Sequence, residues 1–539
     1  MRMIGWIDVD LESNGRGLPS RCLADLAGRP LLARVVEGAL ACPTLREVTV
    51  TCAPRDREAV SAAVAGLPCR VLAVEAPDLP DRALRRRARK WAGHSWRGGI
   101  GSTYVFDEEG NLGRLYAALV ATEATHGVKF SSSGPFVDSA MVEGMLAHLA
   151  AVSAAQDMCI SSAPPGLNYE VYGRDTARRL AGARDTIRTS LALSTTQVTP
   201  DPASLDFWYP LDVDVISAAV RLLADSARGL DLVRSLVAAK GLGLLRAPAK
   251  EVLAAVAERP ELVAWRLPEE VTVEIGLGAL PASDLRPRVE GRPGMMTAET
   301  LTTIAEQLSD ADDVRWTFGS LGDPLIDFRL LRGWLPTSRA FGVHVASTGG
   351  WPTRECALEL AQSNVDIVSA ELTAATAAGY AKCHEATPED FDRVVAWLDS
   401  ILELRKGGAP FVLVEWVKVK EQEGEWEAFY DRWAGIADGV VVRGFCDYAG
   451  QVADRAIMHL LPGRRGVCER LQRRMTVLPN GDVTLCEMDY LGKHAIGNVH
   501  RDRLEDLWAG RFTQVRRAHA RGDFGAFPLC PTCKEWGAL

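Results

Sequence analysis

The sequence predicts an α/β protein of several domains that ends in a small cysteine-bearing module. Short apolar runs alternate with amphipathic, helix-like stretches over residues 1–190, and the alternation returns six times between residues 265 and 450. This order of elements is typical of parallel sheets covered by helices. Four of the twelve cysteines lie in the C-terminal region. A chain of 539 residues fits about three domains, which we expect at 1–190, 265–463 and 464–539, with a helical connector over 191–264.

Residues 1–190 contain the elements of a mostly parallel α/β layer. The expected strands are Met3–Val9, Val48–Cys52, Cys69–Val74, Val128–Ser132 and Met158–Ser162. The expected helices between them are Leu31–Ala41, Arg55–Ala65, Leu115–Thr125 and Ala140–Ala151. In the connector, Asp212–Ala224 and Gly229–Ala239 are expected to be helical.

Residues 265–463 predict a partial (βα)6 barrel. The expected strands are Val271–Ile275, Val314–Phe318, Gly342–Ser347, Val365–Ala370, Phe411–Lys418 and Gly439–Arg443. One helix carries clear end signals, because Thr387 can cap it, Pro388 suits its first position and Gly407 follows its apolar face. Six strand and helix units in succession favour a barrel-like sheet.

The composition excludes several classes of protein. A net charge of −9 and a pI near 5.6 argue against attraction of the whole chain to nucleic acid or to an anionic membrane. No charged leader opens the sequence and no segment sustains about 18 uncharged apolar residues, so we expect a cytoplasmic protein. The cysteines are too sparse for a disulfide scaffold.

The spacing of the C-terminal cysteines indicates a metal centre. Cys530 and Cys533 form a CxxC pair, and Cys468 and Cys486 supply a second, distant pair. Two such pairs can complete a four-thiolate site once the fold brings them together. The spacing alone leaves iron-sulfur, structural zinc and unliganded thiols open.

The sequence around these cysteines resembles the SPASM domain, an auxiliary iron-sulfur module of many radical S-adenosylmethionine enzymes. The resemblance rests on four stretches, Met475–Cys486, Ile496–Val499, Leu504–Trp508 and Leu529–Cys533. It implies a four-iron four-sulfur cluster on Cys468, Cys486, Cys530 and Cys533, with zinc as the alternative.

The predicted barrel resembles a radical S-adenosylmethionine core in two motifs, Phe318–Leu325 and Val368–Leu372. The resemblance places Gly322, Asp323 and Pro324 at the methionine end of the cofactor, with Asp323 where a glutamate is usual; an ordinary barrel turn is the alternative. The family's Cys-x-x-x-Cys-x-x-Cys triad is missing, because Gly276–Gly291 contains no cysteine. We therefore expect no radical initiation, and the missing ligands argue against a role for S-adenosylmethionine.

The N-terminal region resembles sugar-nucleotide cytidylyltransferases and their nucleotide-diphospho-sugar transferase relatives over Gly15–Leu32. The resemblance implies a loop that cradles nucleotide phosphates, with Arg21 in place of the usual lysine. Ser133, two residues before Pro135, replaces the aspartate that binds metal in that family, so we expect a lost transferase activity. The whole layout resembles the spiro-SPASM proteins.

Three further features are ambiguous. The basic run Arg82–Lys90 is interpreted as a solvated helix face rather than a nucleic-acid site. The glycine-rich Trp96–Thr103 could bind an anion or form a simple turn. The pair Cys383 and His384 is interpreted as packing.

Three functions follow from these patterns. The first is a cluster-binding protein derived from radical enzymes, which acts by binding, by electron transfer, or with a partner enzyme or peptide. The second is a nucleotidyl- or sugar-nucleotide transferase that binds nucleotide in its N-terminal domain. The third is an active radical enzyme with unusual ligands.

Overall fold

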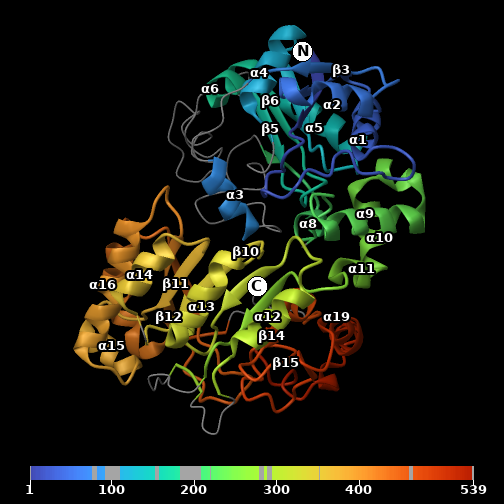
Figure 1. Cartoon of the computed structure of the whole chain (residues 1–539). Coiled ribbons are helices and arrows are strands. Elements are labelled where there is room, and N and C mark those ends of the chain that lie inside the picture. Colours follow the sequence, from blue (N-terminus) through green and yellow to red (C-terminus); the bar gives the residue numbers. More distant parts are fainter. Residues whose placement is uncertain are drawn as a thin grey trace. The chain divides into compact units, whose positions relative to one another are not determined.

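The computed structural model describes residues 2–75, 82–91, 110–151, 157–181, 208–218, 220–277, 285–287, 294–350, 352–459 and 465–536. The chain forms two compact units, Met1–Val263 and Ala264–Leu539 (Figure 1). The predicted glycine-rich loop Trp96–Thr103 lies outside the described residues. So does most of Gly276–Gly291.

The first unit is built on a seven-stranded sheet in the order β3-β2-β1-β4-β6-β5-β7. Its strands are β1 Met3–Val9, β2 Leu45–Cys52, β3 Arg70–Ala73, β4 His126–Phe130, β5 Met158–Ser161, β6 Glu170–Gly173 and β7 Trp208–Tyr209. The first four strands pair in parallel, whereas β6 is antiparallel to both β4 and β5. The predicted α/β class with a mostly parallel sheet is confirmed, and β6 and β7 are additions that the apolar pattern did not reveal.

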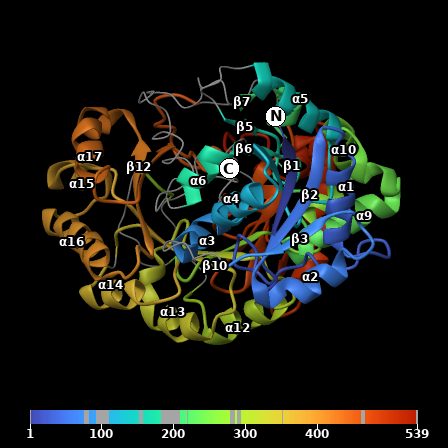
Figure 2. The same ribbon diagram turned by 90° about the horizontal axis from the view of Figure 1, so that it is seen from above.

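Helices cover both faces of this sheet. The helices of this unit are α1 Leu31–Leu40, α2 Arg57–Ala63, α3 Arg82–Lys90, α4 Leu112–Ala121, α5 Ser139–Ala151, α6 Arg174–Ala181, α8 Val213–Ile216, α9 Ala227–Lys240 and α10 Ala249–Ala257, followed by α11 Pro260–Ala264. Alternate residues of β1 point to opposite faces. Ile7 and Val9 join the core that contains α1, α5 and α9, while Ile4 and Trp6 join the core under α4 and α6. Figure 2 shows these helix groups on either side of the strands.

The predicted helix Asp212–Ala224 is wrong beyond its first turn. Only α8 forms, and the backbone that follows is held by distant loops. Leu222 N donates to Pro165 O (2.8 Å), and Ala224 N donates to Ser133 O (2.8 Å). These tertiary hydrogen bonds replace those of a helix.

The second unit contains a nine-stranded sheet in the order β13-β12-β11-β10-β9-β8-β14-β15-β16. Its strands are β8 Glu270–Val273, β9 Arg315–Phe318, β10 Gly342–Ser347, β11 Ile367–Glu371, β12 Phe411–Lys418, β13 Gly439–Gly444, β14 Arg474–Val477, β15 Asp482–Thr484 and β16 Gly497–Asn498. Strands β8 to β13 lie side by side in chain order and are all parallel. The six predicted strands are therefore present, in the order that a partial barrel requires, and helices follow the first five of them.

The helices between these strands form an arc outside the sheet, as Figure 2 shows for α12 to α17. The helices of this unit are α12 Ala298–Gln307, α13 Phe328–Trp334, α14 Arg354–Ala361, α15 Ala377–Cys383, α16 Pro388–Leu404, α17 Trp426–Trp433, α18 Glu469–Arg473, α19 Leu504–Leu507 and α20 Thr513–Ala520. Helix α16 begins as predicted, with Thr387 at its N-cap and Thr387 N donating to Asp390 Oδ2 (2.8 Å). No helix within the described residues combines the length and the apolar character needed to cross a bilayer.

One continuous core joins the barrel strands to the C-terminal segment. Strand β14 pairs in parallel with β8, and β15 folds back on β14 in a hairpin. The core residues Val273 and Phe318 belong to the same buried cluster as Met475, Trp508 and Phe527. The C-terminal segment is thus an extension of the barrel's sheet and core.

Candidate functional site

The structure brings the four predicted C-terminal cysteines around one cavity. Cys468 immediately precedes α18, and Cys486 follows β15. Gly481 adopts a left-handed φ of 83° in the β14–β15 turn, which a glycine tolerates without strain. Cys530 and Cys533 share a tight turn in which Cys533 N donates to Cys530 O (3.3 Å). All four thiols line the same cavity.

The walls of this cavity are largely apolar. The apolar lining side chains are Leu471, Leu485, Met488, Phe527, Leu529 and Trp536. Arg465, Arg470, His519 and Glu535 supply the polar part of the lining. An enclosure of this kind restricts the access of solvent to whatever the thiols bind.

Burial and mutual proximity raise the pKa of these thiols, so they stay protonated while no metal is bound. Burial, followed by the charges of Cys468 and Cys533, raises the pKa of Cys530 to about 12. Burial likewise raises the pKa of Cys486 well above its ordinary value, and Glu487 adds to this effect. Glu535 N donates to Cys533 Sγ (3.3 Å), which favours the thiolate. Metal binding would release these protons.

Charged groups next to the cavity are paired. Arg470 contacts Glu487 (3.0 Å) and Glu535 (3.5 Å). Arg465 donates from Nη2 to Cys530 O (2.6 Å) and lies over the ring of Phe524. Within the described residues, no three His, Cys, Asp or Glu side chains converge as ligands of a single metal ion.

His519 is a cavity residue that sequence reasoning missed. It lies on α20, is 2% exposed, and neither ring nitrogen has a hydrogen-bond partner within the described part of the chain. Its ring packs edge-on against Phe524, with centroids 5.0 Å apart. Burial lowers the pKa of His519 to about 4. No local pattern distinguishes this histidine from the other eight.

The predicted cofactor turn Gly322-Asp323-Pro324 is buried and internally bonded. Asp323 Oδ2 accepts from Ser347 Oγ (3.0 Å), Thr348 N (3.2 Å), Thr348 Oγ1 (3.3 Å) and Gly350 N (2.9 Å). Its Oδ1 accepts from Leu325 N (3.0 Å). Gly322 N donates to Glu274 Oε2 (2.9 Å). The Asp323 carboxylate thus joins the loops after β9 and β10.

An ion cluster lies where β11, β12 and β13 end. Arg286, from the loop in which the resemblance would place the cysteine triad, contacts Glu371 (2.8 Å) and donates to Leu321 O (3.3 Å). Arg443 contacts the same Glu371 and also Glu415 (3.2 Å). Glu371 is 2% exposed. The sequence pattern did not reveal this cluster, because its members come from four separate segments.

The other cysteines of this unit lie in different surroundings. Cys356 contacts Thr353, Cys383 contacts Gln422, and Cys446 lies 3.6 Å from Met488 Sδ. The neighbour of Cys383, His384, is buried and packs on the ring of Tyr380. This surrounding agrees with the packing interpretation of the Cys383 and His384 pair.

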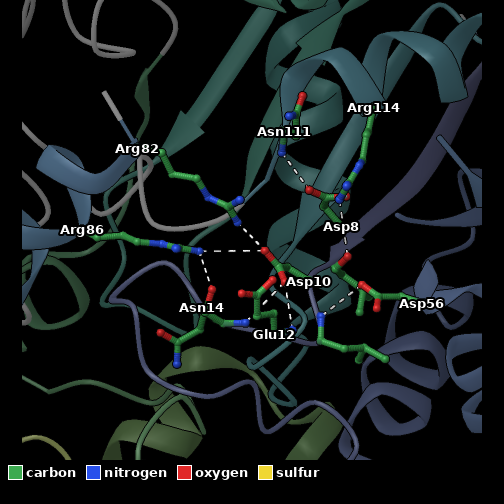
Figure 3. A network of polar contacts seen from close by, with 12 residues as sticks. Asp8, Asp10, Glu12, Asn14, Asp56, Arg82, Arg86, Asn111 and Arg114 are labelled. Carbon is green, nitrogen blue, oxygen red and sulfur yellow. Dashed lines mark hydrogen bonds and ion pairs between the residues drawn. The ribbon is translucent and has the colours of Figure 1, made fainter. Parts of the chain in front are cut away.

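The segment between β1 and the predicted phosphate loop, Gly15–Leu32, carries the carboxylates Asp10 and Glu12, as Figure 3 shows. Asp10 Oδ1 accepts from Glu12 N (3.0 Å) and Ser13 N (3.3 Å). Arg82 pairs with Asp10, and Arg86 donates to Ser13 Oγ (2.6 Å). Burial raises the pKa of Asp10, but the contacts with Arg82 outweigh it and the net shift is downward.

The basic run is therefore not the solvated helix face that we predicted. Its arginines Arg82 and Arg86 reach the loop after β1, and Arg89 is fully buried. The sequence predicted a helix here but not which partner its charged face meets.

Asp8, which the sequence did not single out, and the two predicted positions Ser133 and Arg21 are held by hydrogen bonds within the first unit. Asp8 accepts from Thr51 Oγ1 (2.7 Å), Asn111 N (2.8 Å) and Arg114 Nη1 (3.3 Å) (Figure 3). Ser133 is buried and its carbonyl oxygen accepts from Ala224 N (2.8 Å). Arg21 lies in the loop before α1, where Ala24 N donates to its carbonyl oxygen (2.9 Å).

Comparison with known structures returned several chains that each align with about half of this chain. BtrN in complex with AdoMet and 2-DOIA is 17% identical and aligns over 50% of this chain and 93% of its own, with a TM-score of 0.35. A cytidylyltransferase from Leptospira borgpetersenii serovar Hardjo-bovis is 12% identical over 49% of this chain and 96% of its own, with a TM-score of 0.35. SuiB of Streptococcus suis, bound to precursor peptide SuiA, is 13% identical over 50% of this chain and 70% of its own, with a TM-score of 0.36.

Comparison of sequences gave two matches. An uncharacterized protein of Treponema pallidum (strain Nichols) is 32% identical over 119 residues, which span 22% of this chain and 32% of that relative. Residues 468–534 match the SPASM family, described as an iron-sulfur cluster-binding domain. The C-terminal part of the chain, with all four cavity cysteines, is therefore a SPASM domain.

Proposed function

We propose that this chain is a cluster-binding protein derived from radical S-adenosylmethionine enzymes, and that it does not initiate radical chemistry itself. It acts through its SPASM domain, by binding or by electron transfer, with a partner enzyme or a peptide. The one observation that carries the proposal is the set of four cysteines around a single apolar-walled cavity.

The residues of the cavity fit a four-iron four-sulfur cluster. Cys468, Cys486, Cys530 and Cys533 provide one thiolate for each iron. Backbone N–H groups directed at the sulfurs, such as Glu535 N at Cys533 Sγ, favour the thiolate form. A bound cluster would supply one-electron redox chemistry, with a potential set by its charge, its hydrogen bonds and its exposure.

Two observations in the barrel support the loss of radical initiation. The segment that would carry the cysteine triad has no cysteine. It contributes Arg286, which forms a buried ion pair with Glu371. A guanidinium cannot replace a soft thiolate ligand. Within the described residues the side-chain oxygens of Asp323 accept hydrogen bonds from its own barrel, at the end of β10 and in the adjoining loops, which supports a structural role for this carboxylate.

Metal analysis of anaerobically purified protein tests the proposal. We expect about four irons and four acid-labile sulfides per chain, and loss of most of the iron in Cys530→Ala. Cys356→Ala is the matched control, because this buried thiol lies on α14 and does not line the cavity. Zinc in place of iron would contradict the proposal. So would cleavage of S-adenosylmethionine by reduced protein that has lost the cavity cysteines.

A further inference from the structure

His519 is a buried side chain whose ring nitrogens have no hydrogen-bond partner in the described part of the chain. Its residue is 2% exposed, and both Nδ1 and Nε2 are shielded from solvent without a partner in the described chain. A neutral imidazole always carries one N–H donor and one acceptor nitrogen. Leaving such a donor buried and unpaired destabilises the folded state. A buried imidazole without a hydrogen-bond partner therefore calls for a structural or functional explanation.

The residues around His519 indicate that an acceptor for its imidazole N–H would lie in the cavity. Phe524 covers one side of the ring, edge to face at 5.0 Å. The remaining neighbours in the cavity wall are chiefly the four cysteines and apolar side chains. The nearest cation, Arg465, is turned to Cys530 O and to the ring of Phe524. Inside the cavity the side-chain acceptors are the cysteine sulfurs and the Glu535 carboxylate, and Glu535 already pairs with Arg470 (3.5 Å), which leaves sulfur as the acceptor for this ring.

We infer that His519 is a positioning residue of the cluster, which donates an imidazole N–H hydrogen bond to a sulfur of the bound cluster. This inference rests on the proposed function, because the acceptor is supplied by the cluster. Four cysteines already provide one thiolate per iron, so the imidazole is left as a donor and not as a ligand. Such a bond stabilises the reduced, more negative cluster and raises its reduction potential.

Redox titration of reconstituted full-length protein tests this role. We expect His519→Phe to keep its iron and sulfide and to be harder to reduce. Its ratio of reduced to oxidised cluster should fall roughly tenfold at a fixed poise, which is about 59 mV for a one-electron couple. His519→Gln keeps an N–H donor and should recover most of the wild-type ratio. His494→Phe is the matched control, because His494 packs edge-on against Phe527 at 5.6 Å but does not line the cavity.

The outcomes separate the inference from the proposed function. Wild-type protein without iron would overturn the proposed function. Wild-type protein with a cluster whose reduction is unchanged in His519→Phe would overturn the inference alone.

A spectroscopic measurement covers the case in which His519→Phe loses its cluster. Pulsed electron paramagnetic resonance of the reduced wild-type protein, grown with ¹⁵N-histidine, should show a weak ¹⁵N coupling. The coupling should persist in His494→Phe. A coupling as strong as that of a directly ligating imidazole, or no coupling, would overturn the inference.

Discussion

At the scale of single residues, Asp323 joins two barrel loops through one buried carboxylate. Its five hydrogen bonds reach Leu325, Ser347, Thr348 and Gly350. We expect Asp323→Ala to destabilise the second unit by at least about 3 kcal/mol, because several buried donors lose their acceptor at once. Urea unfolding followed by tryptophan fluorescence measures this.

A control lies in the same loop. Asp327 caps α13 through a single bond to Leu330 N (3.3 Å), so Asp327→Ala should cost only about 1 kcal/mol. Equal losses in the two variants would show that the extra bonds of Asp323 add no stability.

Glu274 gives the second unit a pH dependence of its own. Burial raises the pKa of Glu274 to about 7, although Leu321 N and Gly322 N donate to it. A carboxyl with a higher pKa in the folded state than in the unfolded chain binds its proton more tightly when folded. The stabilisation that the protonated Glu274 carboxyl provides is therefore complete below about pH 4.5 and is lost as the pH rises through about 7.

Glu274→Gln should remove this part of the pH dependence. The wild-type melting temperature should fall between about pH 5 and pH 7.5 more steeply than that of the variant. Melting curves across this range, recorded in buffers of equal ionic strength, make the comparison. Parallel curves for the two proteins would contradict the assigned shift.

The candidate site was only partly predictable from single residues. The four cysteines can be recognised in the sequence because ligand chemistry restricts both residue type and spacing. His519 and Arg286 carry no such signal, since their roles arise from burial and from partners distant in the sequence. Orphaned polar atoms are visible only after the chain has folded.

At the scale of elements, we expect the contacts between the loop after β1 and helix α3 to disfavour nucleotide binding by the first unit. The Asp10 carboxylate stands in the loop and holds Arg82, and Ser133 offers no carboxylate to a metal ion. We expect nucleoside triphosphates with Mg²⁺ to leave the melting temperature unchanged. Binding at roughly a hundred times Kd would stabilise the unit by about 2.7 kcal/mol, which a thermal-shift screen detects.

Asp10→Asn provides the contrast. This variant removes one negative charge and weakens the hold on Arg82 and Arg86, so inorganic triphosphate should raise its melting temperature more than that of the wild type. A nucleotide-dependent rise in the wild-type protein would favour the transferase alternative.

The elements themselves were predicted with uneven success. Strands β10 and β12 have the predicted bounds, because apolar runs of strand length are bounded there by polar or turn residues. The segment after α8 failed because Leu222 and Ala224 give their backbone N–H groups to loops far away in the sequence. The pairing of β14 with β8 joins residues about two hundred positions apart, which local periodicity cannot report.

At the scale of the whole molecule, the shared core predicts how the chain can be divided. A cut between Val263 and Ala264 separates the two compact units, so fragments 1–263 and 264–539 should each unfold cooperatively, with iron only in the second. A cut at residue 463 removes β14 from the edge of β8 and takes Met475, Trp508 and Phe527 out of the buried cluster. Fragment 264–463 should therefore aggregate or lose its cooperative transition, because an unpaired strand edge and an open apolar face favour association. Circular dichroism melting and size-exclusion chromatography compare the three fragments. A cooperative, monomeric 264–463 would show that the barrel does not depend on the core it shares with the SPASM domain.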